Sequence, residues 1–428
     1  MASPRPFPPE IIQRIVYYLT HGWIGLNGPD ENLPLLGIFR SWGRIGGAAC
    51  YSTVDKAWQD AVERETFAEL RLDLDWLAEA EAILNGKQNN RTLQNTFEAF
   101  LSTLNHWTPG PPVKLYLDAF ALTDKGYGDQ SNAPSTRVHG ATYHSPLELE
   151  DPERLLRRGP VNVVTEADME RNRLIGRHFS AAAVCTLVAR LPVAKKVSIN
   201  WRDTSGHSKM RTAFAQALTN VTHALDNFHI AGTYSQLNRQ QPAHQYKPSE
   251  AKPDELSQSL GVLSQRLRNL DLYEVVVSDE LFLQHDLASE MASPAHWARL
   301  ENFSLYYPPV TPSGQWLFYP DPGVPDGQRA TTVADPAIQC RYLTAARAAL
   351  EMPLLKNMTL VTQLERDGDW HKFWYHRDAK GNVAKALWTS SSGFVPEGEV
   401  LAAWREVPRK HLGETELEVE ILEDEYAV

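Results

Sequence analysis

Apolar and polar residues recur in one short order at four places in the second half of the chain. The order is apolar, any residue, asparagine, apolar, polar, apolar, and it occupies residues 225–230, 267–272, 300–305 and 355–360. The alternation after the asparagine predicts a β-strand with one buried face. Because a single unit has no partner for its apolar face, we expect the copies to stack side by side into an extended array with a broad binding surface.

A helix-like segment precedes each copy, which predicts alternating helices and strands. These segments are residues 211–223, 254–265, 278–297 and 336–351. Weaker versions of the same unit end in strands predicted at residues 67–72, 113–117 and 196–199. Because a parallel neighbour is reached only by a crossover, the strands should form a curved parallel sheet with helices on its outside.

The spacing between the four copies is irregular. Their first residues, Leu225, Leu267, Leu300 and Leu355, are 42, 33 and 55 residues apart. A regular leucine-rich repeat has a period of about 20 to 29 residues. The predicted fold class is therefore α/β, with an irregular leucine-rich-repeat-like solenoid of parallel strands over residues 73–428. Each asparagine is expected to precede its strand and to bond neighbouring backbone with its side chain, which is a structural role.

Three segments with little periodicity are predicted as long loops within the array. They are residues 124–159, 235–253 and 319–336. Loops of this length are either disordered or functional. If they project from the rim where the strands end, they flank a binding surface.

The C-terminal part of the array differs from the repeats. Residues 370–376 and 383–388 predict a hairpin, and a helix is expected near residues 399–404. Residues 416–421 alternate strictly between acidic and apolar side chains, which predicts a charged edge strand. The hairpin and this strand would cap the array.

Two helices are predicted before the array. The Pro-Pro-Glu triplet at residues 8–10 suits the first turn of a helix, where an N–H group has no intrahelical partner and a carboxylate lies at the positive end of the dipole. A second helix begins near Ser52, carries Trp58 and leads into the alternating residues 70–74. The apolar residues of the first helix form one stripe: Ile11, Ile12, Ile15, Val16 and Leu19.

These two segments resemble an F-box domain. The family's opening phrase, a hydrophobic residue and prolines followed by glutamate and an amphipathic helix ending in leucine, is matched by residues 7–19. Its tryptophan-bearing helix is matched by residues 54–59. The resemblance covers residues 5–72, is greatest to fungal F-box proteins with poorly characterised C-terminal regions, and implies a small all-α domain over residues 1–72. The chain departs from the family in an insertion at residues 20–47.

The resemblance implies that the N-terminal helices bind a Skp-type adaptor protein and, through it, the cullin of an SCF-type (Skp–cullin–F-box) E3 ubiquitin ligase. The residues that match the adaptor-facing or helix-packing positions are Pro8, Glu10, Ile11, Ile15, Val16, Leu19 and Trp58. The alternative is that the same apolar residues pack inside a helical cap that closes the array. The chain would then be a protein-interaction scaffold without a role in ubiquitination.

Composition narrows the range of partners. A net charge of -11 and a pI near 5.7 disfavour binding to a phosphate backbone, so nucleic acid is not expected. Cys50, Cys185 and Cys340 are far apart and odd in number, which is typical of a reducing compartment. No signal-peptide pattern and no apolar run of about 20 residues occurs. The predicted location is cytoplasmic or nuclear, without a membrane partner.

No group of residues predicts catalysis, a metal site or a cofactor. His371 and His376 are five apart on a predicted strand, so they face opposite sides and share no metal ion. Asp203, Ser205 and His207 supply the residue types of a hydrolase triad, but they are crowded into one loop without a nucleophile elbow. A non-catalytic role is expected.

Aromatic residues in or beside the strands are the candidates for binding a protein target. They are Tyr116, Trp201, Tyr273 and Tyr306, with Tyr307 and Trp374 in similar positions. Large rings on the concave face of the sheet, opposite the helices, are suited to anchor a partner. The alternative is that some of them fill the space between sheet and helices. Tyr116 lies between Leu115 and Leu117, so alternation places it on the face opposite the leucines.

Overall fold

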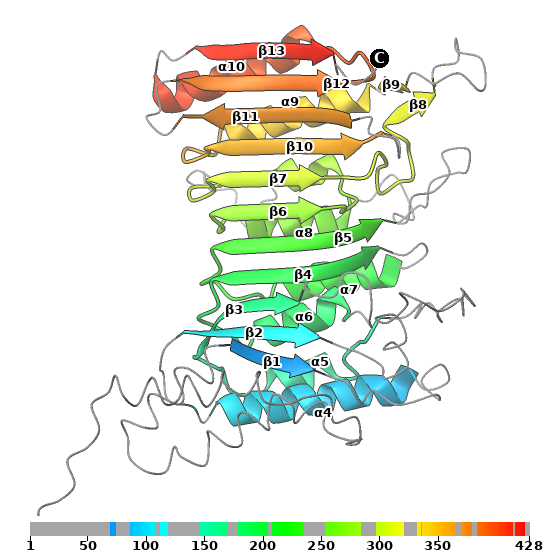
Figure 1. Ribbon diagram of the computed structural model, residues 1–428, viewed down its shortest axis with the longest axis vertical. Helices are drawn as coiled ribbons and strands as arrows, with labels where there is room; N and C mark the ends of the chain where they lie inside the picture. The colour runs from blue at the N-terminus through cyan, green and yellow to red at the C-terminus, as the bar shows by residue number, and fades with distance from the viewer. Residues whose placement is uncertain are drawn as a thin grey trace, which may run out of the picture. The chain divides into compact units, whose positions relative to one another are not determined.

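Figure 1 presents a computed structural model of the protein. It describes residues 69–73, 86–105, 107, 112–118, 146–169, 179–203, 208–234, 253–283, 297–320, 332–334, 336–364, 370–378, 383–413 and 416–423. The chain divides into two units, the first Met1–Phe179 with Thr186–Val197, the second Ser180–Cys185 with Ser198–Val428. All seven candidate adaptor-binding residues lie outside the described residues, as do Ser205 and His207.

The first unit contains three described parallel strands. β1 (Glu69–Asp73) pairs with β2 (Val113–Asp118), and β2 pairs with β3 (Val164–Met169). β1 and β2 confirm the strands predicted at residues 67–72 and 113–117. β3 was not predicted, because its Val-Thr-Glu-Ala-Asp-Met sequence carries two acidic residues and follows a predicted loop instead of a helix.

Two helices of the first unit accompany these strands. α4 (Gly86–Leu104) lies between β1 and β2 in the sequence, and α5 (Pro152–Leu156) precedes β3. The side chain of Asp151 accepts a hydrogen bond from the backbone N–H of Arg154 and caps α5. The buried apolar residues of α4 recur at three- and four-residue spacing, so the helix presents one apolar stripe to the core: Leu93, Phe97, Leu101 and Leu104.

The second unit is built on a mostly parallel sheet. Its strand order is β4-β5-β6-β7-β10-β11-β12-β13, and β11 runs antiparallel to both neighbours. The predicted α/β class with a largely parallel sheet is confirmed, and so are the C-terminal hairpin and edge strand. The strands are β4 (Lys196–Asp203), β5 (Asn227–Tyr234), β6 (Asn269–Tyr273), β7 (Asn302–Tyr306), β10 (Asn357–Gln363), β11 (Trp370–Arg377), β12 (Ala384–Ser390) and β13 (Leu417–Glu423).

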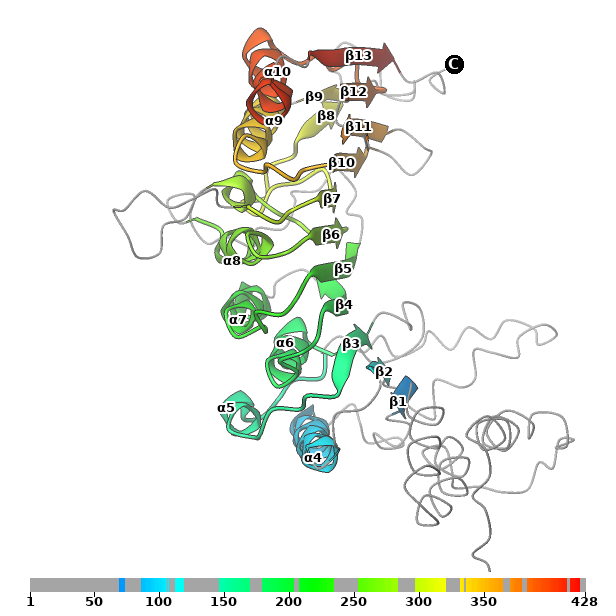
Figure 2. The ribbon, with the colours of Figure 1, turned by 90° about the vertical axis from the view of Figure 1, so that its left-hand side faces the viewer.

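Helices cover one face of this sheet, as Figure 2 shows for the second unit. They are α7 (Ser208–Leu218), α8 (Glu255–Ser264), α9 (Ala337–Ala349) and α10 (Gly398–Leu412), while the short α6 (Ala181–Val188) is divided between the two units. The first three confirm predicted helices. The C-terminal helix, expected near residues 399–404, is much longer than that.

Two features of the loops differ from expectation. The helix expected over residues 278–297 is wrong in its described part, where only the 3₁₀ helix η4 (Asp279–Phe282) forms. The ends of the loop expected at residues 319–336 also pair, since β8 (Phe318–Pro320) is antiparallel to β9 (Thr332–Ala334). Both are short-range structures that helical or alternating periodicity does not reveal.

The four copies of the repeated phrase lie side by side, as predicted, and they are in register. Asn227, Asn269, Asn302 and Asn357 begin β5, β6, β7 and β10 and are direct neighbours. The same register aligns the next residue of each copy in one buried row beneath the helices: Phe228, Leu270, Phe303 and Met358. Identical positions of the sequence repeat are therefore identical positions of the sheet.

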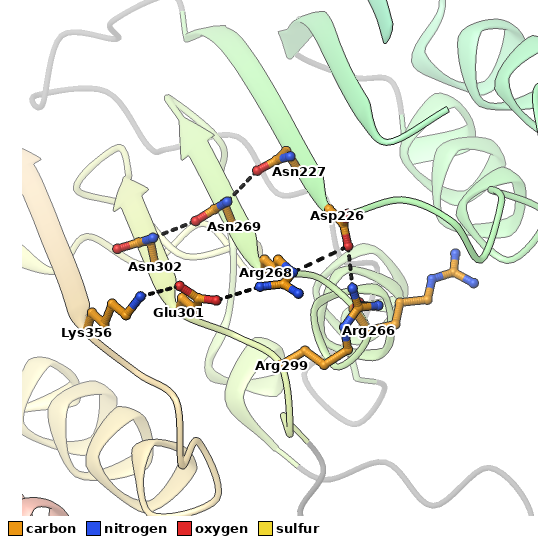
Figure 3. Close-up of polar contacts among 9 residues, drawn as sticks. All are labelled: Asp226, Asn227, Arg266, Arg268, Asn269, Arg299, Glu301, Asn302 and Lys356. Atoms are coloured by element: carbon orange, nitrogen blue, oxygen red, sulfur yellow. Dashed lines mark hydrogen bonds and ion pairs between the residues drawn. The ribbon is translucent and has the colours of Figure 1, made fainter. Parts of the chain in front are cut away.

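The four asparagine side chains form a ladder across the strands. Figure 3 shows the part of it that Asn227, Asn269 and Asn302 form. Nδ2 of Asn357 donates to Oδ1 of Asn302 at 2.6 Å, and Nδ2 of Asn302 donates to Oδ1 of Asn269 at 2.6 Å. Asn269 donates to Asn227 in the same way, and His376 Nδ1 donates to Asn357 Oδ1 at 2.7 Å. These bonds join side chain to side chain, whereas bonding to neighbouring backbone was expected. In-register strands about 4.8 Å apart place each amide within reach of the next.

The residue before each asparagine alternates in charge along the same edge. Arg268 Nη1 lies 2.9 Å from Glu301 Oε1, and Lys356 Nζ lies 2.6 Å from Glu301 Oε2. Asp226 pairs with Arg268 at 3.8 Å and also with Arg299 (Figure 3). The hydrogen bond from Lys356 lowers the pKa of Glu301. Like charges at these positions would repel across the strands, so the alternation supports the same register as the asparagines.

Two buried arginines fix the segment that follows β6. Arg211 of α7 forms a paired hydrogen bond with Asp254 at 2.9 and 2.7 Å and donates to the Val276 carbonyl at 2.6 Å. Arg341 of α9 bonds Asp279 at 3.0 Å and the Val277 carbonyl at 2.9 Å. Burial works to raise the pKa of Asp254, but the charge and hydrogen bonds of Arg211 together with the hydrogen bonds from Ser257 outweigh it and lower that pKa. These bonds satisfy two backbone carbonyls of a segment, residues 275–278, that forms neither helix nor strand.

The predicted opposite orientation of His371 and His376 is confirmed. His371 is fully buried, with Nε2 2.6 Å from the Tyr342 hydroxyl and Nδ1 2.8 Å from the Ser390 hydroxyl. Burial lowers the pKa of His371 from 6.5 to about 3. The imidazole is therefore neutral in the folded protein at physiological pH.

Replacing an interior asparagine of the ladder should destabilise the second unit. Asn302→Ala removes two amide hydrogen bonds and leaves Asn269 Oδ1 and Asn357 Nδ2 without their ladder partners, which should cost about 1–2 kcal/mol at a half-buried site. Urea unfolding followed by circular dichroism measures the change. Ser304→Ala, on the same strand and the same face, is the matched control. Equal losses in the two variants would show that the ladder adds nothing to stability.

Acid should destabilise the protein through His371. Its pKa is about 3 when folded and 6.5 ordinarily, so below pH 6.5 the unfolded chain takes up a proton that the folded chain does not. The free energy of unfolding then falls as pH drops from 6.5 toward 3, by up to about 1.4 kcal/mol per pH unit from this group.

His371→Gln tests this source of acid sensitivity. The variant should show a correspondingly smaller slope of unfolding free energy against pH between 6.5 and 5. His223→Gln, at an exposed position, should keep the wild-type slope. An unchanged slope in His371→Gln would contradict the assignment.

Candidate protein-binding face

The sheet of the second unit has one face directed away from α7, α8, α9 and α10 (Figure 2). We call this side the open face and define it by three rows of neighbouring side chains, of which the first is the asparagine ladder. The second row is His229, Asp271, Ser304, Thr359 and Trp374. The third is Tyr273, Tyr306, Val361 and Lys372.

The second row is polar and ends in an aromatic side chain. His229 Nδ1 lies 2.8 Å from Asp271 Oδ2. Trp374 is 36% exposed and stacks on His376, with ring centroids 5.0 Å apart and an interplanar angle of 4°. Polar groups beside an exposed indole are the chemistry of a surface that binds protein.

A hollow lies at the end of the third row, where β6, β7 and β10 finish. The rings of Tyr273 and Tyr306 line it with their centroids 5.5 Å apart, and Glu274 lies beside them. The remaining lining residues are Tyr307, Pro308, Pro309, Val361, Gln363 and Trp370. We call this site the aromatic hollow. It holds about 430 Å³ including space open to solvent.

The backbone at the hollow is strained at Glu274. Its φ is +53°, in the left-handed region that glutamate rarely adopts, and the conformation costs about 1 kcal/mol or more. Gly232 at the end of β5 makes room for it, because a Cβ atom there would lie 2.5 Å from the carbonyl oxygens of Tyr273 and Glu274. The Glu274 N–H donates to the Tyr306 carbonyl at 2.7 Å, which holds the turn in place.

The predicted aromatic residues have different positions. Tyr273 and Tyr306 lie together on the open face, and Trp374 lies on it too. Tyr116 belongs to the first unit, where it is half-buried while Leu115 and Leu117 are buried, so its predicted orientation is confirmed. Tyr307 is buried.

The expectation that Trp201 is an exposed anchor is wrong. Its side chain is 3% exposed and packs against Phe214, with ring centroids 5.1 Å apart. Trp201 is two and four residues from Ile199 and Val197, which are also buried. Since alternate residues of a strand share a face, it belongs to the core row.

Sequence reasoning missed Glu274 and Trp370 in the hollow. No pattern marked Glu274, because glutamate is not a residue expected at positive φ. The alternating charges could have been found in the sequence, because the residue before the asparagine in the four phrases is Asp226, Arg268, Glu301 and Lys356 in turn. The physical consequence appears only once the copies are aligned in a sheet.

Other kinds of site lack support among the described residues. No cluster of three or more His, Cys, Asp or Glu side chains there could hold a metal ion. Ser390 and His371 are hydrogen-bonded, but His371 is fully buried and no substrate reaches it. In the part of the chain that the structure describes, none of the helices has the length and apolarity needed to cross a membrane.

The fold and the open face together define an α/β protein of repeated helix–strand units, with one polar and aromatic sheet face that none of the helices α7, α8, α9 and α10 covers. Residues 217–426 match a family of unknown function (DUF6546). The match extends from α7 to just beyond β13 and includes the asparagine ladder, the open face and the aromatic hollow. No curated protein and no solved structure matches the chain.

An arginine substitution should change the free energy of unfolding little on one face of β10 and greatly on the other. Thr359→Arg adds a charge on the open face and should change the free energy of unfolding by less than about 1 kcal/mol. Leu360→Arg places the charge among fully buried side chains and should cost more than about 4 kcal/mol, or prevent folding. Circular dichroism and urea unfolding compare the variants. Similar losses at both positions would contradict the assignment of the open face.

Proposed function

We propose that the chain is a non-catalytic substrate-recognition subunit of an SCF-type E3 ubiquitin ligase. Its open face binds a protein target, and its F-box-like N-terminal segment binds a Skp-type adaptor and, through it, a cullin. The repeated units form an irregular leucine-rich-repeat-like solenoid, and the complex works in the cytoplasm or the nucleus. The observation that best supports target binding is the in-register sheet. One of its faces is packed under helices and the other presents Tyr273, Tyr306 and Trp374.

Target binding is supported by the rigidity of the open face. The asparagine ladder and the alternating charges hold neighbouring strands in one register, so the side chains that project from them are fixed in place before a partner arrives. A surface that is already ordered loses little conformational freedom on binding. The exposed Trp374 and the half-buried Tyr273 and Tyr306 then supply aromatic anchors of the kind that such interfaces use.

Adaptor binding is supported by the sequence resemblance. Residues 7–19 and 54–59 match the two phrases of an F-box domain, and the apolar stripe of Ile11, Ile15, Val16 and Leu19 is the part that would meet the adaptor. The segment that resembles an F-box domain runs directly into β1. This is the order expected of an N-terminal docking module followed by a recognition array.

A second candidate function is favoured by the insertion of residues 20–47. It separates the two F-box phrases, and a helical segment that has kept only its packing role would tolerate such an insertion. The chain would then be a protein-interaction scaffold without a ubiquitin-ligase role, and its open face would bind the same kind of partner.

Co-purification with the adaptor separates the two candidates. The full-length chain is co-expressed with a Skp-type adaptor, and the adaptor recovered on the tagged chain is quantified. Ile15→Asp with Leu19→Asp should reduce recovery roughly 100-fold, because two charges would replace apolar contacts. Thr359→Arg on the open face should leave adaptor recovery unchanged. Absence of adaptor from the wild-type chain, or equal recovery with the double variant, would favour the scaffold.

A further inference from the structure

We propose that the aromatic hollow binds the side chain of a lysine or arginine in the target protein. This inference rests on the proposed function only in taking the partner to be a protein, and it specifies the residue type that the open face selects. It follows from three features of the hollow: its aromatic walls, its carboxylate and its strained backbone.

The walls are suited to a cationic side chain with an aliphatic stem. Tyr273, Tyr306 and Trp370 contribute rings to the lining, and the face of an aromatic ring attracts a cation. Trp370 already does so within the chain, because Nζ of Lys372 lies 5.3 Å from the centre of its ring. Pro308 provides an apolar surface of the kind against which the stem of a lysine or arginine packs.

The carboxylate of Glu274 supplies the charge complementary to such a ligand. Glu274 belongs to the lining of the hollow, next to Tyr273. Its position depends on a backbone conformation that glutamate rarely adopts and on the absence of a side chain at Gly232. Glycine or asparagine would satisfy this turn with less strain, and strained residues of this kind concentrate at binding sites. The net charge of the chain, -11, also favours a basic partner.

The same features argue against other side chains. An acidic or phosphorylated residue would meet the Glu274 carboxylate, and like charges at close range repel. A neutral apolar side chain would contact the rings but would gain neither the ion pair nor the cation–π attraction. Charge on the ligand should therefore be the main determinant of affinity.

Three small peptides test the role of that charge. The full-length protein is titrated with acetyl-Gly-Arg-Gly-amide, with the same peptide carrying citrulline, which is a neutral analogue of arginine, and with one carrying norleucine. Saturation-transfer NMR measures these weak affinities. The arginine peptide should bind about tenfold more tightly than either neutral peptide. Equal binding of the three, or binding of none, would overturn the proposal.

Substitutions of residues that line the hollow show which of them cause the preference for the arginine peptide. Glu274→Gln and Trp370→Ala should each reduce the arginine preference to about twofold or less. Glu418→Gln, on β13 at the far end of the sheet, is the matched charge control and should keep the full preference. An undiminished preference in Glu274→Gln would show that the Glu274 carboxylate does not recognise the positive charge of the peptide.

Lys372→Met should increase the affinity for the arginine peptide, and a misfolded variant would not show such an increase. It removes the positive charge next to Trp370, so the arginine peptide should bind about threefold more tightly. Weaker or unchanged binding would contradict the proposal. None of these titrations contains an adaptor, so a failure of adaptor co-purification and a failure of charge recognition are separate results.

Discussion

The register of the parallel strands is the constraint on which the second unit depends. A slip of one residue would send every core side chain to the opposite face. Two sets of contacts resist it at the start of β5, β6, β7 and β10. The amides of the asparagine ladder bond only when identical residues are neighbours, and the charges at the preceding positions attract only in the same alignment. Together they specify which row of each strand is buried.

That register also builds the open face. Because Asn227, Asn269, Asn302 and Asn357 are aligned, the residues two and four positions later are aligned as well. Tyr273 and Tyr306 meet for this reason, although they are 33 residues apart in the chain. Arg211 and Arg341 then hold the segment after β6 from the helix side. The strained turn at Glu274 thus lies between a fixed strand and a fixed segment.

Periodicity predicted the larger part of the architecture. The helices before β5, β6 and β10 have apolar stripes, and the phrases after them alternate, so their type and order could be read directly. β3 and η4 escaped prediction because short elements with mixed polarity have no repeating signal. Trp201 was misplaced although its spacing from Val197 and Ile199 already indicated a buried position.

The sequence by itself determined the class of fold, the repeated unit and the candidate tyrosines, because these depend on local alternation and on the recurrence of one phrase. Only the tertiary structure decided that the asparagines bond one another, that their neighbours alternate in charge across the sheet, and that Glu274 and Trp370 meet Tyr273 and Tyr306 in one hollow. Such contacts join residues tens of positions apart. Their partners are chosen by the alignment of whole strands, which no single segment of the chain encodes.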